Sequence, residues 1–335
     1  MNLKGKSVLT WLDYSQNDFQ GCLDLASKLK REKQQGVPHR RLEGKQVVLL
    51  FQKDSTRTRC AFEVAANDLG MPATYIGSSG SQMGTKESIR DTARVLGRMY
   101  QGIEFRGYHH SDVIELSKFA NVPVWNGLTD KYHPTQVLAD FLTIRERLGH
   151  LTGVKLVFVG DSHNNVCNSL MIGASIMGLH FTAVAPKSLW PDMELVKECE
   201  KRAQDSGATL MFTENISEGV AGAEVIYTDV WVSMGEPKEI WAKRISLLHK
   251  YQVNKQMMEK AGKNAIFLHC LPSFHGLDTE VGRQIAAEYG AEYPHLASGE
   301  LEVTNEVFES HQSFVFDQAE NRLHTIKAIM LATME

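Results

Sequence analysis

Short apolar runs alternate with longer segments of helical periodicity along the whole chain. Runs of this kind predict strands of parallel sheets that are buried on both faces, because helices cover both sides of such sheets. The predicted strands comprise residues 47–51, 73–76, 103–105, 122–125, 155–159, 181–184, 225–227 and 266–268. Between two of them, Ile89, Ala93, Leu96 and Tyr100 have the spacing of one helical stripe. The pattern therefore predicts an α/β protein.

The strand and helix pattern occurs twice, which predicts two doubly wound parallel-sheet domains joined by long helices. We expect the first domain at residues 1–148 and the second at residues 149–317. A long helix after His133 links them, and Pro134 suits its first position because proline is favourable there. The final segment, 318–335, is expected to form a helix that packs back on the first domain.

The composition is that of an ordinary globular protein, and it is informative mainly because it excludes some classes of function. Of the 335 residues, 43% are hydrophobic, and 36 Lys and Arg nearly balance 40 Asp and Glu. A formal charge of −4 argues against a dedicated nucleic-acid or membrane-surface binder. The sequence contains no secretory signal and no apolar stretch of membrane-spanning length. Its five cysteines are widely spaced without a C-x-x-C pair, which favours a reducing compartment. We therefore expect a cytoplasmic protein.

Polar and reactive residues are concentrated in the connections that follow the predicted strands. Ligands of open α/β sheets bind beyond the carboxyl ends of the strands, so these connections predict one cleft lined from both domains. The connection DSTRTR begins a helix with Ser55 as its expected N-cap. First-turn N–H groups have no helical partners, and Arg57 adds a planar fork suited to phosphate oxygens. Hydroxyls on Ser55, Thr56 and Thr58 supply further donors. We interpret this segment as a phosphate cradle, with an ordinary capped helix as the alternative.

Three further connections carry side chains that are suited to catalysis. Arg106 ends an apolar strand, where its charge requires an anionic ligand or an internal carboxylate. His133 opens the linking helix and can donate to a developing oxyanion, or simply cap the helix. Cys270 follows a buried strand, either as a perturbed thiol or as a small buried hydrophobe.

The remaining candidates are less specific. Asp229 can anchor a ligand ammonium or serve as a helix cap, and Asn165 can bind a carboxylate or stabilise a turn. The turn that contains Asn165 lacks G-x-G-x-x-G, which disfavours a nicotinamide cofactor. Gln82 lies in a Gly/Ser-rich loop, and Arg322 opens the last helix. Either residue can reach a ligand or have only a structural role.

The order and separation of these motifs resemble the aspartate/ornithine carbamoyltransferase superfamily, and within it the ornithine branch. The matching blocks are FQKDSTRTRCAFEVA, SQMGTKESIRDTARVLGRM, FRGY, PVWNGLTDKYHPTQVLAD, YTDVWVSMGE, HCLP and FDQAENRLHTIKA. They extend from Phe51 to the C-terminus and cover nearly all of the chain. Four positions depart from the pattern typical of the family, namely Gln52, His163, Cys167 and Ser273. None of these differences removes an expected contact residue.

The resemblance implies that the first domain binds carbamoyl phosphate and the second binds ornithine. Carbamoyl phosphate is then held by Ser55, Thr56, Arg57, Thr58, Gln82, Arg106, His133, Gln136, Cys270, Leu271 and Arg322. Cys270 and Leu271 contribute backbone carbonyls, and Gln82 comes from a neighbouring subunit of a homotrimer or of a higher assembly of trimers. Ornithine is bound by Asn165, Asp229, Ser233 and Met234. The Cys270 thiol lies near its side-chain amine.

The reaction that the resemblance implies is direct transfer of a carbamoyl group from carbamoyl phosphate to the side-chain amine of ornithine. It requires no cofactor and no metal. Catalysis comes from holding both substrates in register and from stabilising negative charge with Arg57, Arg106 and His133. The attacking amine has a pKa of about 10 and must be neutral, so activity is expected to rise toward alkaline pH. The resemblance fits both directions of arginine metabolism.

Three alternatives remain open on the sequence alone. A cysteine hydrolase would use Cys270 with His269 or His275 and pass through a covalent thioester, which mass spectrometry detects. A catalytically inactive relative would only bind ligands, although every expected contact residue is present. An enzyme specific for aspartate or putrescine is the third alternative. Putrescine has no α-carboxylate for the loop at Ser233 and Met234 to sense.

Arg57→Gly is expected to lower turnover by orders of magnitude while the fold survives, because the change removes the guanidinium from the phosphate cradle without touching the predicted core. Steady-state kinetics and circular dichroism of the purified variant check both parts. An active Arg57→Gly protein would contradict the phosphate-cradle assignment.

Overall fold

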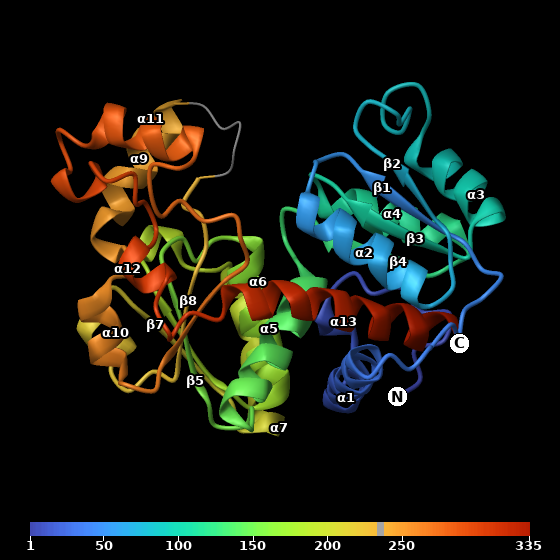
Figure 1. Ribbon diagram of the computed structural model, residues 1–335, viewed down its shortest axis with the longest axis horizontal. Coiled ribbons are helices and arrows are strands. Elements are labelled where there is room, and N and C mark those ends of the chain that lie inside the picture. Colours follow the sequence, from blue (N-terminus) through green and yellow to red (C-terminus); the bar gives the residue numbers. More distant parts are fainter. Residues whose placement is uncertain (233–237) are drawn as a thin grey trace. The chain divides into compact units, whose positions relative to one another are not determined.

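The computed structural model describes residues 1–232 and 238–335, and it divides into two α/β units. Unit 1 comprises Met1–Glu146 together with Ala319–Glu335, and unit 2 comprises Arg147–Gln318. Each unit contains a sheet whose strand pairings are all parallel, with helices on both faces (Figure 1). The predicted fold class of two doubly wound parallel-sheet domains is confirmed.

The sheet of unit 1 has the strand order β2-β1-β3-β4. Its strands are β1 (Val47–Phe51), β2 (Ala73–Ile76), β3 (Gly102–Arg106) and β4 (Val124–Leu128). Every residue of β1 is buried, as its continuous apolar run predicts. Phe51 pairs with Arg106 in the register, so the carboxyl ends of β1 and β3 lie side by side. The connection after β1 and the end of β3 are thereby brought to one edge of the sheet.

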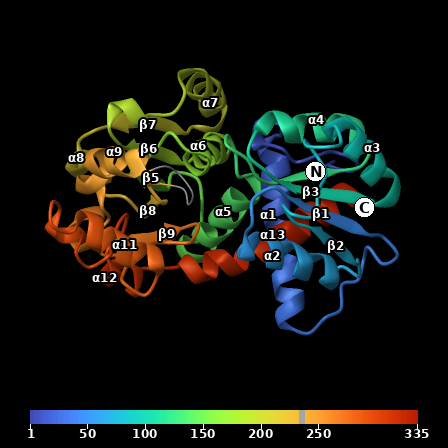
Figure 2. The same ribbon diagram turned by 90° about the horizontal axis from the view of Figure 1, so that it is seen from above.

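Helices cover both faces of this sheet. They are α1 (Gln16–Gln34), α2 (Thr56–Asp68), α3 (Ile89–Met99), α4 (His110–Ala120), α5 (Pro134–Leu148) and α13 (Val315–Met334), with a 3-10 turn η1 (Trp11–Asp13). On one face, Ala93 of α3 and Val113 of α4 share a core with Ile103 of β3. On the other face, Phe62 of α2 packs against Trp125, with ring centroids 6.3 Å apart. Figure 2 shows α3 and α4 on one side of the sheet and α2 on the other.

The sheet of unit 2 has the strand order β7-β6-β5-β8-β9. Its strands are β5 (Lys155–Val159), β6 (His180–Val184), β7 (Thr209–Thr213), β8 (Val225–Thr228) and β9 (Ile266–His269). The structure confirms all eight predicted strands and adds β7, which the sequence analysis missed. β7 is an edge strand with partly exposed residues, so it lacks the continuous apolar run of a central strand.

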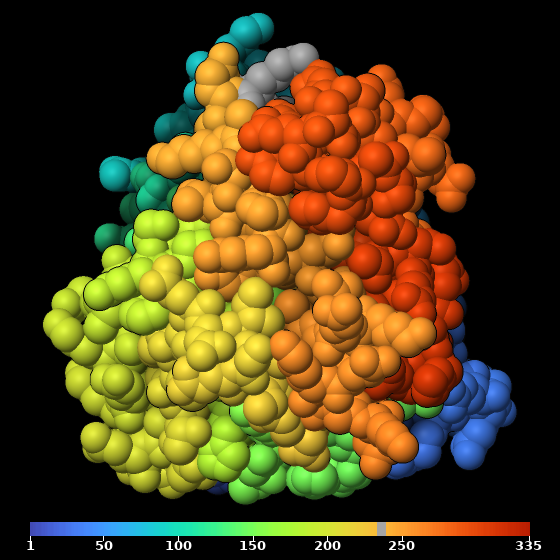
Figure 3. Space-filling view, turned by 90° about the vertical axis from the view of Figure 1, so that its left-hand side faces the viewer, coloured from blue at the N-terminus to red at the C-terminus, as the bar shows by residue number. Residues whose placement is uncertain are grey.

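The helices of unit 2 also form two layers. They are α6 (Asn165–Met177), α7 (Met193–Ser206), α8 (Ile216–Val220), α9 (Lys238–Leu248), α10 (Lys255–Ala261), α11 (Glu280–Tyr289) and α12 (Asn305–Phe308). Three 3-10 turns complete the unit: η2 (Lys187–Leu189), η3 (His249–Tyr251) and η4 (Pro294–Leu296). Figure 2 shows α6 and α7 on one side of the sheet, with α11 and α12 on the other. Figure 3 views the unit from the side of α10 and α12.

Local sequence signals explain where the functionally important helices begin. Ser55 caps α2 by accepting a hydrogen bond from the Thr58 N–H, as predicted. Pro134 is the first residue of α5, also as predicted. The last helix begins at Val315, three residues before the predicted start. Among the described residues, no helix is both long enough and apolar enough to cross a membrane.

Gly97→Ala is expected to destabilise the protein by about 3 kcal/mol. A β-carbon at Gly97 of α3 would lie 1.8 Å from the carbonyl oxygen of Ala120, at the end of α4, so the two helices must separate. Val95→Ala is the matched control, because Val95 lies on the same helix and is exposed. Urea unfolding of both variants measures the difference, and equal midpoints would contradict the close packing of α3 on α4.

Candidate functional site

The first turn of α2 is the segment that the sequence predicts to be a phosphate cradle. The Ser55 hydroxyl accepts from the Thr58 N–H at 3.3 Å, and this cap fixes the direction in which the turn opens. A hollow of about 540 Å³ lies at this point, lined by Asp54, Ser55, Thr56, Arg59, Cys60, Glu63 and Tyr75. First-turn amides and the helix dipole favour negative charge here. The local structure is therefore that of a capped helix N-terminus that favours an anionic group, and its phosphate-binding role stays a prediction.

Two arginines converge on one buried hydroxyl in this turn. Thr58 is fully buried, and its Oγ1 accepts from Arg106 Nη1 at 3.4 Å and from Arg322 Nη2 at 3.0 Å. Arg322 Nη2 also donates to Thr135 Oγ1 at 3.4 Å. Residues from α2, β3, α5 and α13 are thus brought together within unit 1. We call Thr58, Arg106, His133, Thr135 and Arg322 the Thr58 cluster.

His133 is the uncharged member of this cluster. It is 4% exposed and immediately precedes α5, with Nδ1 at 3.5 Å from Thr135 Oγ1. Burial lowers its pKa well below 6.5, and the positive charges of Arg322, Arg106 and Arg57 lower that pKa further. A neutral imidazole at physiological pH can still donate a hydrogen bond to an oxygen that gains negative charge.

Glu104 lies beneath the cluster and was missed by the sequence analysis. Its side chain is fully buried, and neither carboxyl oxygen has a hydrogen-bond partner among the described residues. Burial raises its pKa well above 4.5, although Arg106 and Arg322 act in the opposite direction. The shift favours the protonated acid, which leaves both guanidinium charges available to a ligand.

Gln136 and Gln82 occupy different surroundings. Gln136 is 1% exposed and adjoins Thr135 on α5, where its Nε2 donates to Asp140 Oδ1 at 2.8 Å. Gln82 lies on an exposed loop, and its backbone carbonyl accepts from the N–H groups of Thr85 and Lys86 within a tight turn. The predicted entry of Gln82 into a neighbouring subunit's site stays a prediction.

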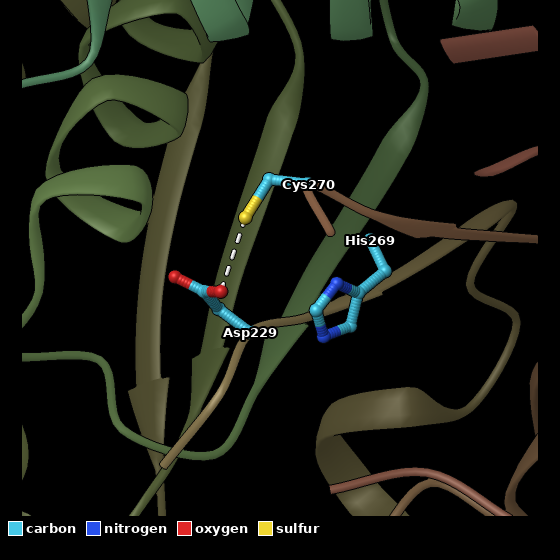
Figure 4. Close-up of side chains that lie close together, drawn as sticks. All are labelled: Asp229, His269 and Cys270. Carbon is cyan, nitrogen blue, oxygen red and sulfur yellow. Dashed lines mark hydrogen bonds between the residues drawn. The ribbon is translucent and has the colours of Figure 1, made fainter. Parts of the chain in front are cut away.

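Unit 2 carries a second group of reactive side chains at the ends of β8 and β9. Cys270 Sγ donates to Asp229 Oδ1 at 3.0 Å (Figure 4). The same carboxylate accepts from the Val230 N–H at 2.8 Å and, through Oδ2, from Asn164 Nδ2 at 3.3 Å. Burial raises the pKa of Asp229, and the hydrogen bonds from Cys270 and from the Val230 N–H oppose that rise. The arrangement gives a half-buried carboxyl suited to an amino group.

The His269 ring supports the backbone that follows β9. Its Nδ1 accepts from the Leu271 N–H at 2.9 Å, and its Nε2 lies 3.2 Å from Glu302 Oε1. Both side chains are fully buried, and Leu271 has a φ of 59°, which few residues other than glycine adopt. His275 stacks on Phe308 at 3.6 Å. The Nδ1 lone pair of His269 is used by the Leu271 N–H, which disfavours the cysteine hydrolase that pairs Cys270 with His269.

Asp229, His269 and Cys270 also form the kind of group that can hold a metal ion. Their ligand atoms all lie within 4.8 Å of one another, and oxygen, nitrogen and sulfur donors of this kind suit zinc. A metal would need a free nitrogen of His269. Its Nδ1 already accepts from the Leu271 N–H, and its Nε2 faces Glu302. The structure therefore gives no basis for a metal-dependent step.

The other predicted ornithine ligands are only partly described. Asn165 is the first residue of α6 and is half-buried, while the preceding Asn164 caps the helix by accepting from the Cys167 N–H at 2.8 Å. Ser233 and Met234 lie outside the described residues. The ornithine assignments therefore stay predictions.

Several residues of these two groups gave no clear signal in the sequence. Glu104 lies within an apolar strand, and Glu302 is 33 positions from His269, so neither contact is local in the chain. The spacing of Gln136 and Asp140 could have been read, because residues four apart share a helix face.

Two family models together match nearly the whole chain. One, described as the carbamoyl-P binding domain of aspartate/ornithine carbamoyltransferase, matches residues 6–146. The other, described as the Asp/Orn binding domain of the same family, matches residues 152–333.

Similar proteins include two named as catabolic ornithine carbamoyltransferases. That of Treponema denticola is 58% identical over 99% of this chain and 96% of its own length. That of Staphylococcus epidermidis is 54% identical over 99% of each chain. A solved structure named as ornithine carbamoyltransferase from Pyrococcus furiosus has a TM-score of 0.89 at 40% identity, covering 100% of this chain and 98% of that one.

His133→Gln is expected to make stability less sensitive to acid. The lowered pKa of His133 means that the unfolded chain binds a proton below about pH 6.5 while the folded protein resists it. The wild type should therefore lose up to about 1.4 kcal/mol per pH unit from this group as the pH falls from 6.5. Urea unfolding of both proteins at pH 7 and pH 5.5 measures the difference. Identical losses would contradict a neutral, buried His133.

Proposed function

Because the chain belongs to the aspartate/ornithine carbamoyltransferase family, we propose that it transfers the carbamoyl group of carbamoyl phosphate to the side-chain amine of L-ornithine. The products are L-citrulline and phosphate. The enzyme is thus a carbamoyltransferase. The single observation that carries the proposal is the convergence of Arg106 and Arg322 on Thr58, in the first turn of a capped helix.

Unit 1 would bind the phosphate of the substrate. Ser55, Thr56 and Thr58 offer hydroxyls and first-turn amides, and Arg57 and Arg322 offer cationic donors. The raised pKa of Glu104 weakens its competition with the phosphate for the guanidinium charges. Ionic contacts with a phosphate are worth more at such a poorly hydrated site than in bulk water. Support for these roles comes from the geometry of the Thr58 cluster.

The carbonyl of the carbamoyl group would be polarised by Arg106 and His133. Charge on this oxygen increases as the amine attacks, so donors fixed in advance lower the barrier. A neutral His133 can perform this task, because a neutral imidazole keeps one N–H donor. The backbone carbonyls of Cys270 and Leu271 are proposed acceptors for the carbamoyl NH₂.

Unit 2 would bind ornithine. The half-buried carboxyl of Asp229 is a suitable partner for an amino group, and the half-buried amide of Asn165 for the α-carboxylate. The Cys270 thiol, which already donates to Asp229, lies where it can contact the same amino group. Ser233 and Met234 complete the proposed set.

We further propose that the enzyme is a cytoplasmic homotrimer that works in the catabolic direction. Support for the direction comes from the two relatives named as catabolic, which share more than half of their residues with this chain. The trimer follows from the family resemblance, which also brings Gln82 from a neighbouring subunit.

A citrulline-formation assay with ornithine, putrescine and aspartate side by side tests the substrate. We expect kcat/KM for ornithine to exceed that for either competitor by at least about 10³-fold, because a buried polar pocket rejects ligands that leave its groups unpaired. Carbamoylated products of the competitors are measured in the same samples. A preference for putrescine would favour the alternative amine carbamoyltransferase.

A further inference from the structure

Gln136 and Asp140 form a buried hydrogen-bonded pair on one face of α5. They are four residues apart, and Gln136 Nε2 donates to Asp140 Oδ1 at 2.8 Å. Gln136 is 1% exposed and Asp140 is fully buried. The carbonyl oxygen of the same amide, Gln136 Oε1, is buried and has no hydrogen-bond partner among the described residues.

The chemistry of Asp140 decides which way this amide faces. The oxygen and nitrogen of a Gln side chain have nearly the same shape, so packing alone does not distinguish the two orientations. The NH₂ group of Gln136 donates to Asp140 Oδ1, the orientation that a carboxylate favours because its oxygens accept hydrogen bonds. Oε1 is consequently directed away from Asp140 as an acceptor that lacks a donor.

An unsatisfied buried acceptor costs free energy unless a ligand supplies the missing donor. Gln136 adjoins Thr135, whose hydroxyl accepts from Arg322 in the Thr58 cluster. The family resemblance assigns both this cluster and Gln136 to carbamoyl phosphate, so the ligand that the cluster would hold is also the one that would meet this acceptor. Carbamoyl phosphate carries an NH₂ group one bond from its carbonyl carbon, and acyl phosphates with a methyl group there offer no donor.

We propose that Asp140 is a positioning residue that sets substrate specificity by holding the carbonyl oxygen of Gln136 toward the NH₂ of the carbamoyl group. The inference rests on the proposed function. Asp140 does not touch the substrate. By fixing the orientation of the Gln136 side chain, Asp140 favours a ligand with an amide over a methyl ketone of the same shape.

Two stable ligands of matched shape test the proposal by calorimetry. Phosphonoacetamide presents an NH₂ group, and acetonylphosphonate presents a methyl group at the same position. The wild type is expected to bind the amide at least about 10-fold more tightly. In Asp140→Leu the acceptor for Gln136 Nε2 is removed. Its Kd for phosphonoacetamide should rise about 10- to 100-fold, while its Kd for acetonylphosphonate changes by less than about twofold.

A double variant restores the hydrogen bond between positions 136 and 140 with the donor and the acceptor exchanged. In Gln136→Glu combined with Asp140→Asn, the Asn NH₂ donates to one carboxylate oxygen, and the other oxygen still faces the ligand. The double variant should recover the preference for the amide, and it carries the test if Asp140→Leu does not fold. Loss of the preference in the double variant would overturn the proposal.

Thr143→Val is the matched control on the same helix. Thr143 is fully buried, donates to the Ala139 carbonyl and accepts from Asn321 Nδ2 at 2.9 Å, so its loss should lower stability and leave the ligand preference unchanged. If Asp140→Leu weakens both ligands equally, or keeps the wild-type ratio, Asp140 is only structural. If the wild type binds neither ligand, the proposed function itself has failed.

Discussion

The convergence of two guanidinium groups on the buried hydroxyl of Thr58 is the interaction on which the rest of unit 1 depends. Thr58 can accept from Arg106 and Arg322 only because Ser55 caps α2 and fixes its first turn beside the end of β3. Positive charges held this close together at a buried residue repel one another and are poorly hydrated. Binding of an anion would offset the free-energy cost of that arrangement. Unit 1 is therefore built around a ligand of negative charge.

Burial also sets the protonation states that this ligand meets. The same surroundings raise the pKa of Glu104 and lower the pKa of His133, so both groups favour their neutral forms. A charged Glu104 would compete with the substrate for Arg106 and Arg322, and a charged His133 would need to be desolvated. With both groups in their neutral forms, the arginines carry the positive charge of this cluster. Electrostatic selectivity for an anion thus follows from burial as well as from the number of basic residues.

How much of the structure can be predicted from the sequence depends on how far apart the contacting residues are in the chain. Ser55, Pro134 and the eight apolar runs act locally, through capping, backbone geometry and periodicity, so the sequence predicts them. β7 was missed because an edge strand needs no continuous apolar run. Contacts such as Arg322 with Thr58 join residues 264 positions apart, and no local pattern encodes them. These residues were assigned to ligand binding through the family resemblance. The hydrogen bonds that connect them, and the neutral Glu104, required the structure.

The end of β9 shows why a reactive residue type does not by itself identify a reaction. A cysteine beside a histidine suggests a nucleophile with its base, yet the His269 ring accepts from the Leu271 N–H and faces Glu302, and the Cys270 thiol donates to Asp229. His269 thereby stabilises a left-handed Leu271, a conformation that costs on the order of 1–2 kcal/mol for a residue with a β-carbon. A strained backbone held by a fully buried side chain presents its carbonyl groups in one fixed direction. In such a segment the histidine fixes the backbone conformation. This is the role that direct transfer between two bound substrates requires of His269.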